Sequence, residues 1–556
     1  MLIPTRLRLL VSILTAHALF ACDSESPGSS TTDVASSSTP TSEASTPGPT
    51  TPSMVSGGQP AVSTALTSAP STSIPRPSTT PSASQSPSTS STALDGLGGT
   101  SGSPTQGTGG GSSSASSGNG GQQNFGGAGA SELGGASAGG GEENQPQPDE
   151  PQPDGPRPTV TAMAGTTLVK IDVGAKRQTF EGWGTSLCWW ANHVGGWSQD
   201  AVDAVVDAVI DPVDGLGYNI FRYNIGGGEN PAHDHMDQFR DMPGFQDEDG
   251  TWRWDADAGQ RAVAASIVAR GEGIIMEAFS NSPPYWMTKS GCASGSSDGS
   301  NNLKDDAYDA FAAYLVGVVA HYDSEFGIHF RTLEPLNEPN ANWWKSNGSQ
   351  EGCHFGAADQ QKLIQAVGKE LEAKSLTTVV SASDENSMDD ALKNISGFSS
   401  DTLDVMQQIN VHSYSGSKRA ELRALATQKG KRLWQSESGP LNQDLSGDID
   451  AALFMAGRII DDLRDLQAEA WIDWQVGDPA RSWASLTLDD RNQKAAPLKR
   501  FYMHAGFSRY IRPGAVFVDI DNKDMVAALS ADGHSLAIVA RNSDTAASRA
   551  FTFDLT

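Results

Sequence analysis

The sequence has little positive charge. Its 556 residues contain 38 Lys and Arg against 66 Asp and Glu, and the formal net charge is -28. A surface of this kind repels nucleic acid and anionic membrane, and we expect neither as a direct partner. A neutral or cationic partner stays open. So does the simpler interpretation, in which the acidity only keeps an exported protein soluble.

The apolar run at the N-terminus is too short to cross a bilayer. It extends from Leu9 to Phe20, follows two arginines, and is typical of an export signal. The run leads into Leu19–Cys22, which is similar to the lipobox of bacterial lipoproteins, where the cysteine is lipidated and becomes the new N-terminus. We predict that residues 1–22 are a lipoprotein-type signal and that Cys22 carries the membrane anchor. An ordinary signal peptide is the alternative.

Large apolar residues are almost absent from residues 23–158. This stretch consists mainly of Ser, Thr, Pro and Gly, and all 13 Trp of the chain lie at or after Trp183. Such a composition cannot bury enough surface to offset the conformational entropy of the chain. We therefore predict a disordered linker that holds the folded part away from a membrane.

Cysteine is scarce, with four residues in the whole chain. The three that follow Cys22 are an odd number, which allows one disulfide and one free thiol in an oxidising compartment. Cys292 and Cys353 both lie in polar segments that contain Gly or Ser, and we predict that they pair. Cys188 lies among tryptophans and is expected to be a buried thiol. The spacings indicate no zinc site, and we expect no metal and no cofactor.

From Thr159 onwards, short runs rich in β-branched or aromatic residues alternate with stretches of helical period. This alternation predicts an α/β protein with a catalytic (β/α)8 TIM barrel over residues 179–500. A doubly wound sheet is the rival, but no dinucleotide-binding or P-loop motif stands at a strand-to-helix turn. The expected strands are Thr179–Gly184, Asn219–Asn224, Gly273–Phe279, Arg331–Leu336, Thr378–Ser381, Gln408–His412, Arg432–Ser436 and Ala470–Gln475.

Short alternating strands follow the barrel. We predict a side β-sandwich domain over residues 501–556, joined by a strand or strands within residues 159–178. The last expected strand runs to the end of the chain, so we expect this domain to be truncated at the C-terminus. Its expected strands are Ala515–Ile520, Met525–Ser530, Ser535–Arg541 and Ser548–Leu555.

Two carboxylates stand at the ends of strands that lie nearly opposite each other in the predicted barrel. Glu338 follows the fourth strand, and Glu437 ends the seventh. Barrels display their reactive groups at the C-terminal ends of the strands. Hydrolysis of a glycoside with retention needs two carboxyl groups about 5–5.5 Å apart. Either residue alone is more simply an ordinary loop carboxylate. Together they indicate the catalytic pair of such an enzyme, one as nucleophile and the other as general acid/base.

The chain resembles glycoside hydrolase family 30, from about Thr166 to its end. Asn337-Glu338-Pro339 with Ser436-Glu437 is similar to the pattern of the clan of retaining barrel glycosidases. The other matching segments are Phe180–Leu187, Trp189–Asn192, Arg222–Asn224 and Asn281–Met287. Within the family, the segments Gly182–Leu187 and Gln350–His354 are most similar to endo-β-1,6-galactanases. The resemblance therefore implies β-1,6-linked galactan side chains of arabinogalactan as substrate.

The resemblance also implies roles, with Glu338 as general acid/base and Glu437 as nucleophile. Asn337 is expected to bind the sugar 2-hydroxyl, Arg222 to keep Glu437 ionised, and Tyr414 to donate to it. His412 is either a substrate ligand or a satisfied polar group of the barrel wall. Trp474 is expected to be a platform on which a sugar stacks.

Further residues complete the predicted cleft. Asn281, Trp183 and Trp286 are expected to contact substrate, and Trp343 and Trp344 to serve the leaving group. A neutral, stacking-dominated cleft of this kind fits galactan. The same mechanism on β-1,6-glucan, xylan or a glucosylceramide-like glycoside is the alternative, as is a non-catalytic surface carbohydrate-binding protein. We expect a monomer whose partner is a polysaccharide.

Overall fold

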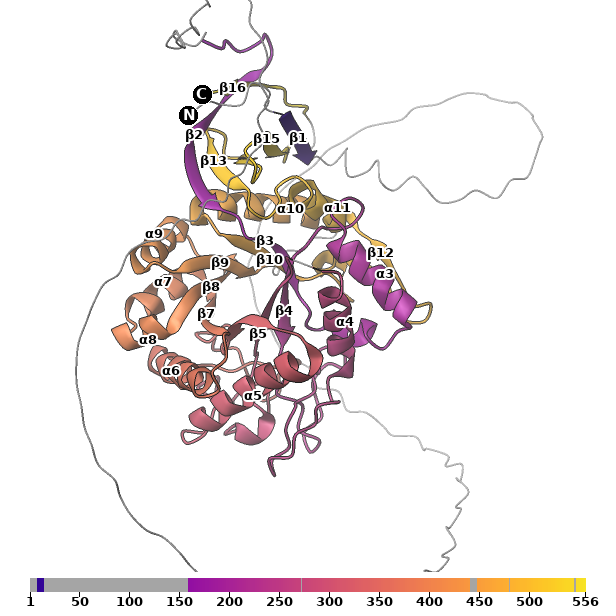
Figure 1. Ribbon diagram of the computed structural model, residues 1–556, viewed down its shortest axis with the longest axis vertical. Helices are drawn as coiled ribbons and strands as arrows, with labels where there is room; N and C mark the ends of the chain where they lie inside the picture. The colour runs from indigo at the N-terminus through magenta and orange to yellow at the C-terminus, as the bar shows by residue number, and fades with distance from the viewer. Residues whose placement is uncertain (1–7, 15–158, 272, 441–447, 480, 545–546) are drawn as a thin grey trace, which may run out of the picture. The chain divides into compact units, whose positions relative to one another are not determined.

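The computed structural model describes residues 8–14, 159–271, 273–440, 448–479, 481–544 and 547–556. Eight parallel strands close into a barrel (Figure 1) in the order β10-β3-β4-β5-β6-β7-β8-β9. The (β/α)8 prediction is confirmed, and each predicted strand overlaps an observed one. The barrel strands are β3 (Gly182–Ser186), β4 (Ile220–Asn224), β5 (Ile275–Phe279), β6 (Phe330–Glu334), β7 (Val379–Ser387), β8 (Met406–Ser415), β9 (Arg432–Glu437) and β10 (Ala470–Gln475).

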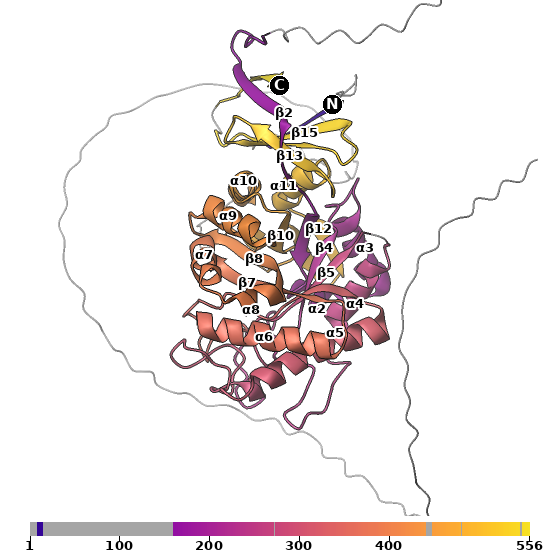
Figure 2. The same cartoon turned by 60° about the vertical axis from the view of Figure 1, so that its left-hand side comes forward.

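Helices surround this barrel (Figures 1 and 2) and bury their apolar stripes against it. In α6, for example, Leu363, Ile364, Val367 and Leu371 recur at helical spacing and are all buried. Among the described residues, no helix is both long and apolar enough to cross a membrane. The helices are α2 (Trp190–Val194), α3 (Gln199–Ile210), α4 (Ala258–Val268), α5 (Tyr308–Phe326), α6 (Ala357–Ala373), α7 (Met388–Ser396), α8 (Ser400–Val405), α9 (Arg419–Lys429), α10 (Asp448–Asp461) and α11 (Lys499–Ser508), with short helical turns η2 (Tyr285–Met287), η3 (Asp462–Leu466) and η4 (Arg481–Trp483).

A second sheet lies beside helices α10 and α11 (Figure 2) and has the strand order β1-β15-β14-β13-β2-β16. Among the described residues it is one sheet, and one of its faces, with Phe517 and Val539, packs directly into the core of the barrel. The second layer of the predicted sandwich is not found among the described strands. Its strands are β1 (Arg8–Leu14), β2 (Thr167–Thr179), β13 (Val516–Ile520), β14 (Met525–Leu529), β15 (Ser535–Arg541) and β16 (Phe551–Leu555).

Three further points concern the predicted domain boundaries. Helix α11 crosses the predicted boundary at 500/501 and packs against α10, so the barrel extends past it. Strand β1, which pairs in parallel with β15, includes part of the predicted signal. Cys22 and residues 23–158 lie outside the described residues.

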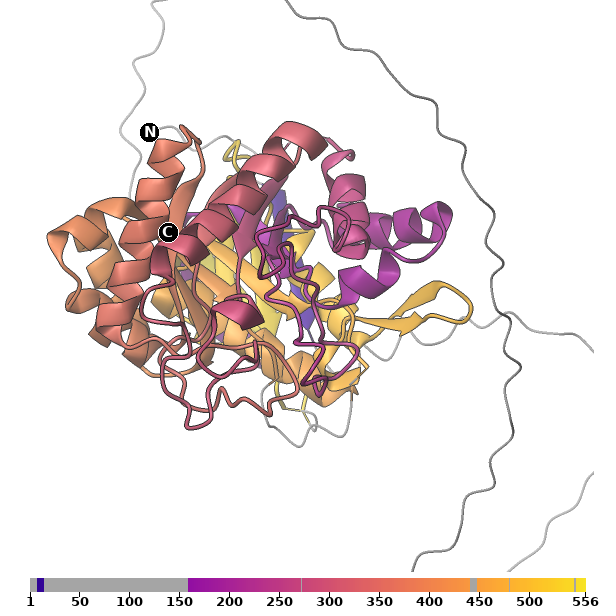
Figure 3. The same ribbon diagram turned by 90° about the horizontal axis from the view of Figure 1, so that it is seen from below.

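A hairpin of β11 (Leu486–Asp489) and β12 (Lys494–Pro497) stands out from the body (Figure 3).

Candidate active site

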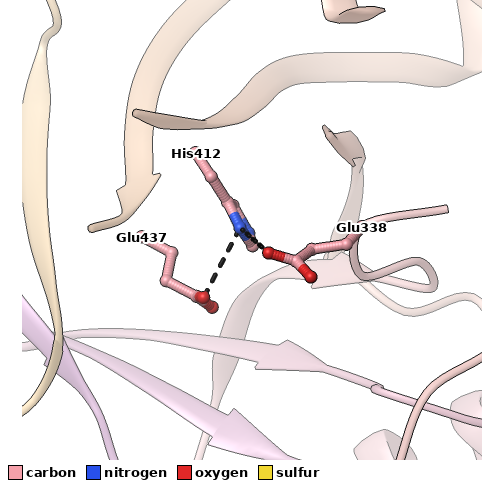
Figure 4. Close-up of side chains that lie close together, drawn as sticks. All are labelled: Glu338, His412 and Glu437. Atoms are coloured by element: carbon pink, nitrogen blue, oxygen red, sulfur yellow. Dashed lines mark hydrogen bonds and ion pairs between the residues drawn. The ribbon is translucent and has the colours of Figure 1, made fainter. Parts of the chain in front are cut away.

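The two predicted carboxylates meet. Glu338 lies four residues after the end of β6, and Glu437 is the last residue of β9. Their side chains approach each other beside His412 (Figure 4), and one atom from each of the three residues lies within 4.8 Å of the others. Both carboxyl groups are almost completely buried, with residue exposures of 7% and 5%. The barrel therefore places two acids where they can act on one bond.

His412, on β8, lies between the two carboxylates and is fully buried. Its Nδ1 atom is 3.3 Å from Glu338 Oε1 and 3.4 Å from Glu437 Oε1, and its Nε2 atom is 3.2 Å from Asp384 Oδ2. Burial lowers the pKa of His412, but Glu437 and Asp384 outweigh burial and raise this pKa to about 10. The imidazole is therefore a cation at neutral pH. Of the two readings of His412, the structure favours a wall residue that contacts both acids.

Two further groups surround Glu437. The Tyr414 hydroxyl donates to Glu437 Oε1 at 2.9 Å. Arg222 Nη1 is 3.6 Å from Glu437 Oε2. Arg222 is itself fully buried between carboxylates, with Nε 2.8 Å from Glu277 and Nη2 2.5 Å from Asp384. The predicted neighbours of Glu437 are therefore both in place.

The neighbours decide which carboxyl group carries the proton. Burial raises the pKa of Glu437 to about 7, the charge of Glu338 adds to this, and His412 and Arg222 oppose it. Two like charges this close share one proton near neutral pH. Glu437 faces two cations and the Tyr414 hydroxyl, whereas Glu338 faces His412 and accepts from Asn386 Nδ2 at 2.5 Å. The negative charge is therefore more stable on Glu437.

Asp384 is a buried residue of the site that the sequence analysis missed. Burial raises the pKa of the Asp384 carboxyl, but Arg222 and His412 lower this pKa by more than burial raises it. The pKa of Asp384 therefore lies well below its usual range, and the group is ionised. It accepts from Ser436 Oγ at 2.5 Å, and its main-chain oxygen accepts from Glu338 N at 2.9 Å. We expected the fifth barrel strand to end at Ser381, but β7 continues to Ser387. The polar run Asp384–Asn386 after an apolar strand was the available signal.

A cleft of about 450 Å³ opens above the two acids. The predicted Asn281, Asn337, Tyr414, Trp474, Trp343 and Trp344 all line it. Trp474 packs edge-on against Trp189, with ring centroids 5.1 Å apart. The sequence analysis missed five lining residues, three in loops, one near the end of β7 and one in the turn η4. They are Arg240, Gln350, Asn386, Asp478 and Trp483.

Two glycines let aromatic rings form walls of this cleft. A Cβ atom on Gly352 would lie 2.2 Å from the ring of Trp344, and one on Gly439 would lie 2.3 Å from the ring of Trp483. Any larger residue at either position must displace a tryptophan from the cleft. Gly439 is two residues after Glu437, so the same short segment positions both the carboxylate and the ring.

Two tryptophans predicted to contact substrate, Trp183 and Trp286, do not line this cleft. Trp183 is buried in the core, where its indole N–H donates to the main-chain oxygen of Ile511 at 2.7 Å and its ring packs beside Phe507. It lies near the start of β3, and barrel clefts open at the ends of the strands. Trp286 is half-buried, donates to the main-chain oxygen of Gln246 at 3.0 Å, and does not line the cleft.

The predicted disulfide is also wrong. Cys292 and Cys353 are buried free thiols, and so is Cys188 as expected. Their two segments are joined by a backbone hydrogen bond instead, from Gly352 N to Ala293 O at 3.0 Å. Burial raises the pKa of Cys353 to about 12, so this thiol stays protonated at neutral pH and is a poor nucleophile for thiol exchange.

Comparison with known families decides what this barrel is. Residues 166–482, more than half of the chain, match the profile of O-glycosyl hydrolase family 30. The chain belongs to this family. It is accordingly a glycoside hydrolase.

Two curated family relatives are similar to the chain. An endo-beta-1,6-galactanase from Hypocrea rufa is 35% identical over 419 residues, which cover 71% of this chain and 84% of the fungal protein. An exo-beta-1,6-galactobiohydrolase from Bifidobacterium longum subsp. longum is 26% identical over 406 residues, covering 54% of this chain and 26% of that larger protein. The first likeness extends over most of both chains.

Solved structures share the fold. Family 30 xylanase C from Talaromyces cellulolyticus superposes with a TM-score of 0.54 and 19% identity, covering 66% of this chain and 85% of its own. An endo-beta1,6-glucanase superposes with a TM-score of 0.51 and 18% identity, covering 68% of this chain and 87% of its own. At such identities the likeness concerns the fold alone.

Proposed function

We propose that the protein is a retaining endo-glycosidase that cleaves β-1,6-linked galactan by double displacement. The observation that carries this proposal is the meeting of Glu338 and Glu437 oxygens within 4.8 Å. Retaining enzymes hold their carboxyl groups about 5–5.5 Å apart, whereas inverting enzymes need about 6.5–9.5 Å to admit a water molecule between acid and sugar. The close pair supports attack by one carboxylate on the sugar itself.

In the first step, a Glu437 oxygen attacks the anomeric carbon while the bond to the leaving oxygen breaks. Glu338 gives its proton to that oxygen, so the leaving chain departs as an alcohol. The result is a covalent glycosyl-enzyme with inverted configuration. Asn337, whose Oδ1 has no hydrogen-bond partner in the described structure, is free to bind the sugar 2-hydroxyl as charge develops at the neighbouring carbon.

In the second step, Glu338 acts as the base. Glu338, which gave its proton to the leaving oxygen in the first step, now accepts a proton from water. The water oxygen attacks the anomeric carbon, the bond to Glu437 breaks, and the second inversion restores the original configuration. Tyr414, Arg222 and His412 then stabilise the released carboxylate of Glu437.

The substrate part of the proposal rests on the relatives and on the cleft. The more similar curated relative is an endo-beta-1,6-galactanase, and most of its length is matched. Five tryptophans line the cleft and provide apolar faces on which galactose rings can stack, and these are Trp189, Trp343, Trp344, Trp474 and Trp483. The tryptophan-lined cleft and the similarity to a galactanase therefore both support a neutral polysaccharide as substrate.

The test is incubation with β-1,6-galactan, β-1,6-glucan and glucuronoxylan, with product sizing and NMR of the first anomer released. We expect galacto-oligosaccharides of β configuration from galactan alone. Oligosaccharides released from glucan or xylan instead would identify that glycan as the substrate. A first product of α configuration would exclude retention. The absence of product from all three would favour a surface carbohydrate-binding protein.

We also propose where the enzyme acts. The export signal and the cysteine at its end support an enzyme held at the cell envelope by a lipid on Cys22, with residues 23–158 as the tether. An anchored enzyme of this kind would meet its polysaccharide outside the cell.

A further inference from the structure

The three side chains in Figure 4 also have the geometry of a metal site. His412 Nδ1 is 3.3 Å from Glu338 Oε1 and 3.4 Å from Glu437 Oε1. Imidazole nitrogen and carboxylate oxygen bind zinc at about 2.0–2.2 Å, and two such ligands of a tetrahedral ion lie roughly 3.3–3.5 Å apart. Both measured separations match an edge of that tetrahedron. The fourth position would face the cleft.

A third carboxylate, that of Asp384, lies behind the histidine. Metal-binding histidines almost always give their other ring N–H to a carboxylate or carbonyl, which fixes the ring and raises its basicity. Asp384 Oδ2 is 3.2 Å from His412 Nε2, and Asp384 is itself held by Arg222 Nη2 and Ser436 Oγ, each at 2.5 Å. The ring is therefore positioned with Nδ1 facing the two glutamates.

We propose that Glu338, His412 and Glu437 bind a divalent transition-metal ion such as zinc, in competition with the sugar. The ion would occupy the space where the anomeric carbon and the leaving oxygen must lie, and it would hold both acids. Metal binding is thus inhibitory. The metal ion is a second class of ligand for this site, besides the sugar, whichever glycan the enzyme cleaves.

The site surrounds His412 with negative charge. The groups facing His412 are the carboxylates of Glu338, Glu437 and Asp384 and the hydroxyl of Tyr414, with Arg222 as the nearby cation. A metal ligand must be deprotonated, so the ion would take the place of any proton on His412 Nδ1.

Titration calorimetry of the folded enzyme with zinc chloride tests the site without any substrate. We expect one ion bound to this site per chain, with proton release visible as a dependence of the heat on the buffer. His412→Gln should weaken binding at least 100-fold, and Asp384→Asn about 10- to 100-fold, the usual effect of losing the carboxylate behind a ligand histidine. Circular dichroism melts establish that each variant is folded, and Glu437→Gln provides a second variant at the site.

The matched control is His233→Gln/His235→Gln. These two histidines are exposed, flank Asp234 and are the surface pair most able to bind zinc by chance. The double variant should keep both galactan cleavage and competitive inhibition by zinc. Unchanged zinc affinity in folded His412→Gln, or loss of zinc binding in the control, would overturn the inference. Zinc binding through His412 without galactan cleavage would support it and contradict only the proposed function.

Discussion

At the scale of single residues, the surroundings of each acid decide its charge. Glu277 is fully buried, yet it accepts hydrogen bonds from Thr332 Oγ1 at 2.6 Å and Asn410 Nδ2 at 3.0 Å beside the Arg222 guanidinium. Glu334 is equally buried, but burial and the neighbouring carboxylates raise its pKa well above the ordinary value. Two equally buried glutamates inside one barrel therefore have opposite surroundings, hydrogen-bond donors and a cation for Glu277 and other carboxylates for Glu334.

Glu437→Ala should lower turnover by roughly 10⁴-fold, because no group remains to form the covalent intermediate. Added azide should restore cleavage of an aryl β-galactoside substrate and give a glycosyl azide of inverted configuration, as NMR will show. The matched control is Glu338→Ala, in which azide attacks the intermediate on Glu437 and gives the retained azide. A retained product from Glu437→Ala would place the nucleophile elsewhere.

His412→Gln tests the charge that stabilises the nucleophile. His412 lowers the pKa of Glu437, which burial raises, so removing the cation should raise this pKa further. Cleavage needs ionised Glu437, and the acidic limb of the profile of kcat/KM against pH should therefore move to higher pH, while kcat falls about 10- to 100-fold. The measurement is kcat/KM from pH 4 to 8. An acidic limb at the wild-type pH would contradict the assignment of charge to His412.

At the scale of elements, a buried carboxyl joins two loops at the mouth of the barrel. Glu351, after β6, accepts from Gly227 N at 2.6 Å and lies 3.2 Å from Asn224 Nδ2, at the end of β4. Burial raises the pKa of Glu351 to about 8. Asn224 Oδ1 has no partner in the described structure, so a rotated Asn224 amide can accept the Glu351 proton. The neutral Glu351 carboxyl then accepts from Gly227 N and donates to Asn224, so that it is hydrogen-bonded to both segments.

This arrangement predicts how stability depends on pH. A glutamate with a folded pKa above its unfolded value of about 4.3 stabilises fully below that value, and the contribution is lost as pH rises towards the folded pKa. Thermal melts of wild type should therefore show a decline between about pH 5 and 8. Glu351→Gln, which can donate to Asn224 Oδ1 without ionising, should weaken this decline. Glu351→Ala should lower stability at all pH values by roughly 1–3 kcal/mol, because buried donors lose their acceptor. Identical slopes for wild type and Glu351→Gln would contradict the account.

At the scale of the whole molecule, one segment is a strand of the side sheet and also part of the predicted export signal. Arg8–Leu14 pairs with β15 as strand β1, and it also lies in the predicted export signal. Cleavage before Cys22 would remove β1 and leave the five-stranded order β15-β14-β13-β2-β16 beside the barrel. Those five strands include the face that packs into the barrel core. We therefore expect the mature enzyme to keep its side sheet.

Cys22→Ala tests the anchor. In an expressing bacterium, wild type should label with fatty acid and sediment with membranes, whereas the variant should lose all label and appear in the soluble fraction. The reason is that lipid addition needs the cysteine thiol. Equal distribution of the two proteins would favour an ordinary signal peptide, and galactan cleavage by both would show that the barrel works without its anchor.

The sequence by itself determined the eight strands and the positions of Glu338 and Glu437, because strand period and the end of an apolar run are local properties. It also indicated Arg222, Tyr414 and Trp474 through the family resemblance. Only the tertiary structure decided that Trp183 packs in the core, that Cys292 and Cys353 remain thiols, and that Asp384 supports His412 from β7. Those outcomes depend on which distant segments meet, and contacts of that kind leave no periodic trace in the chain.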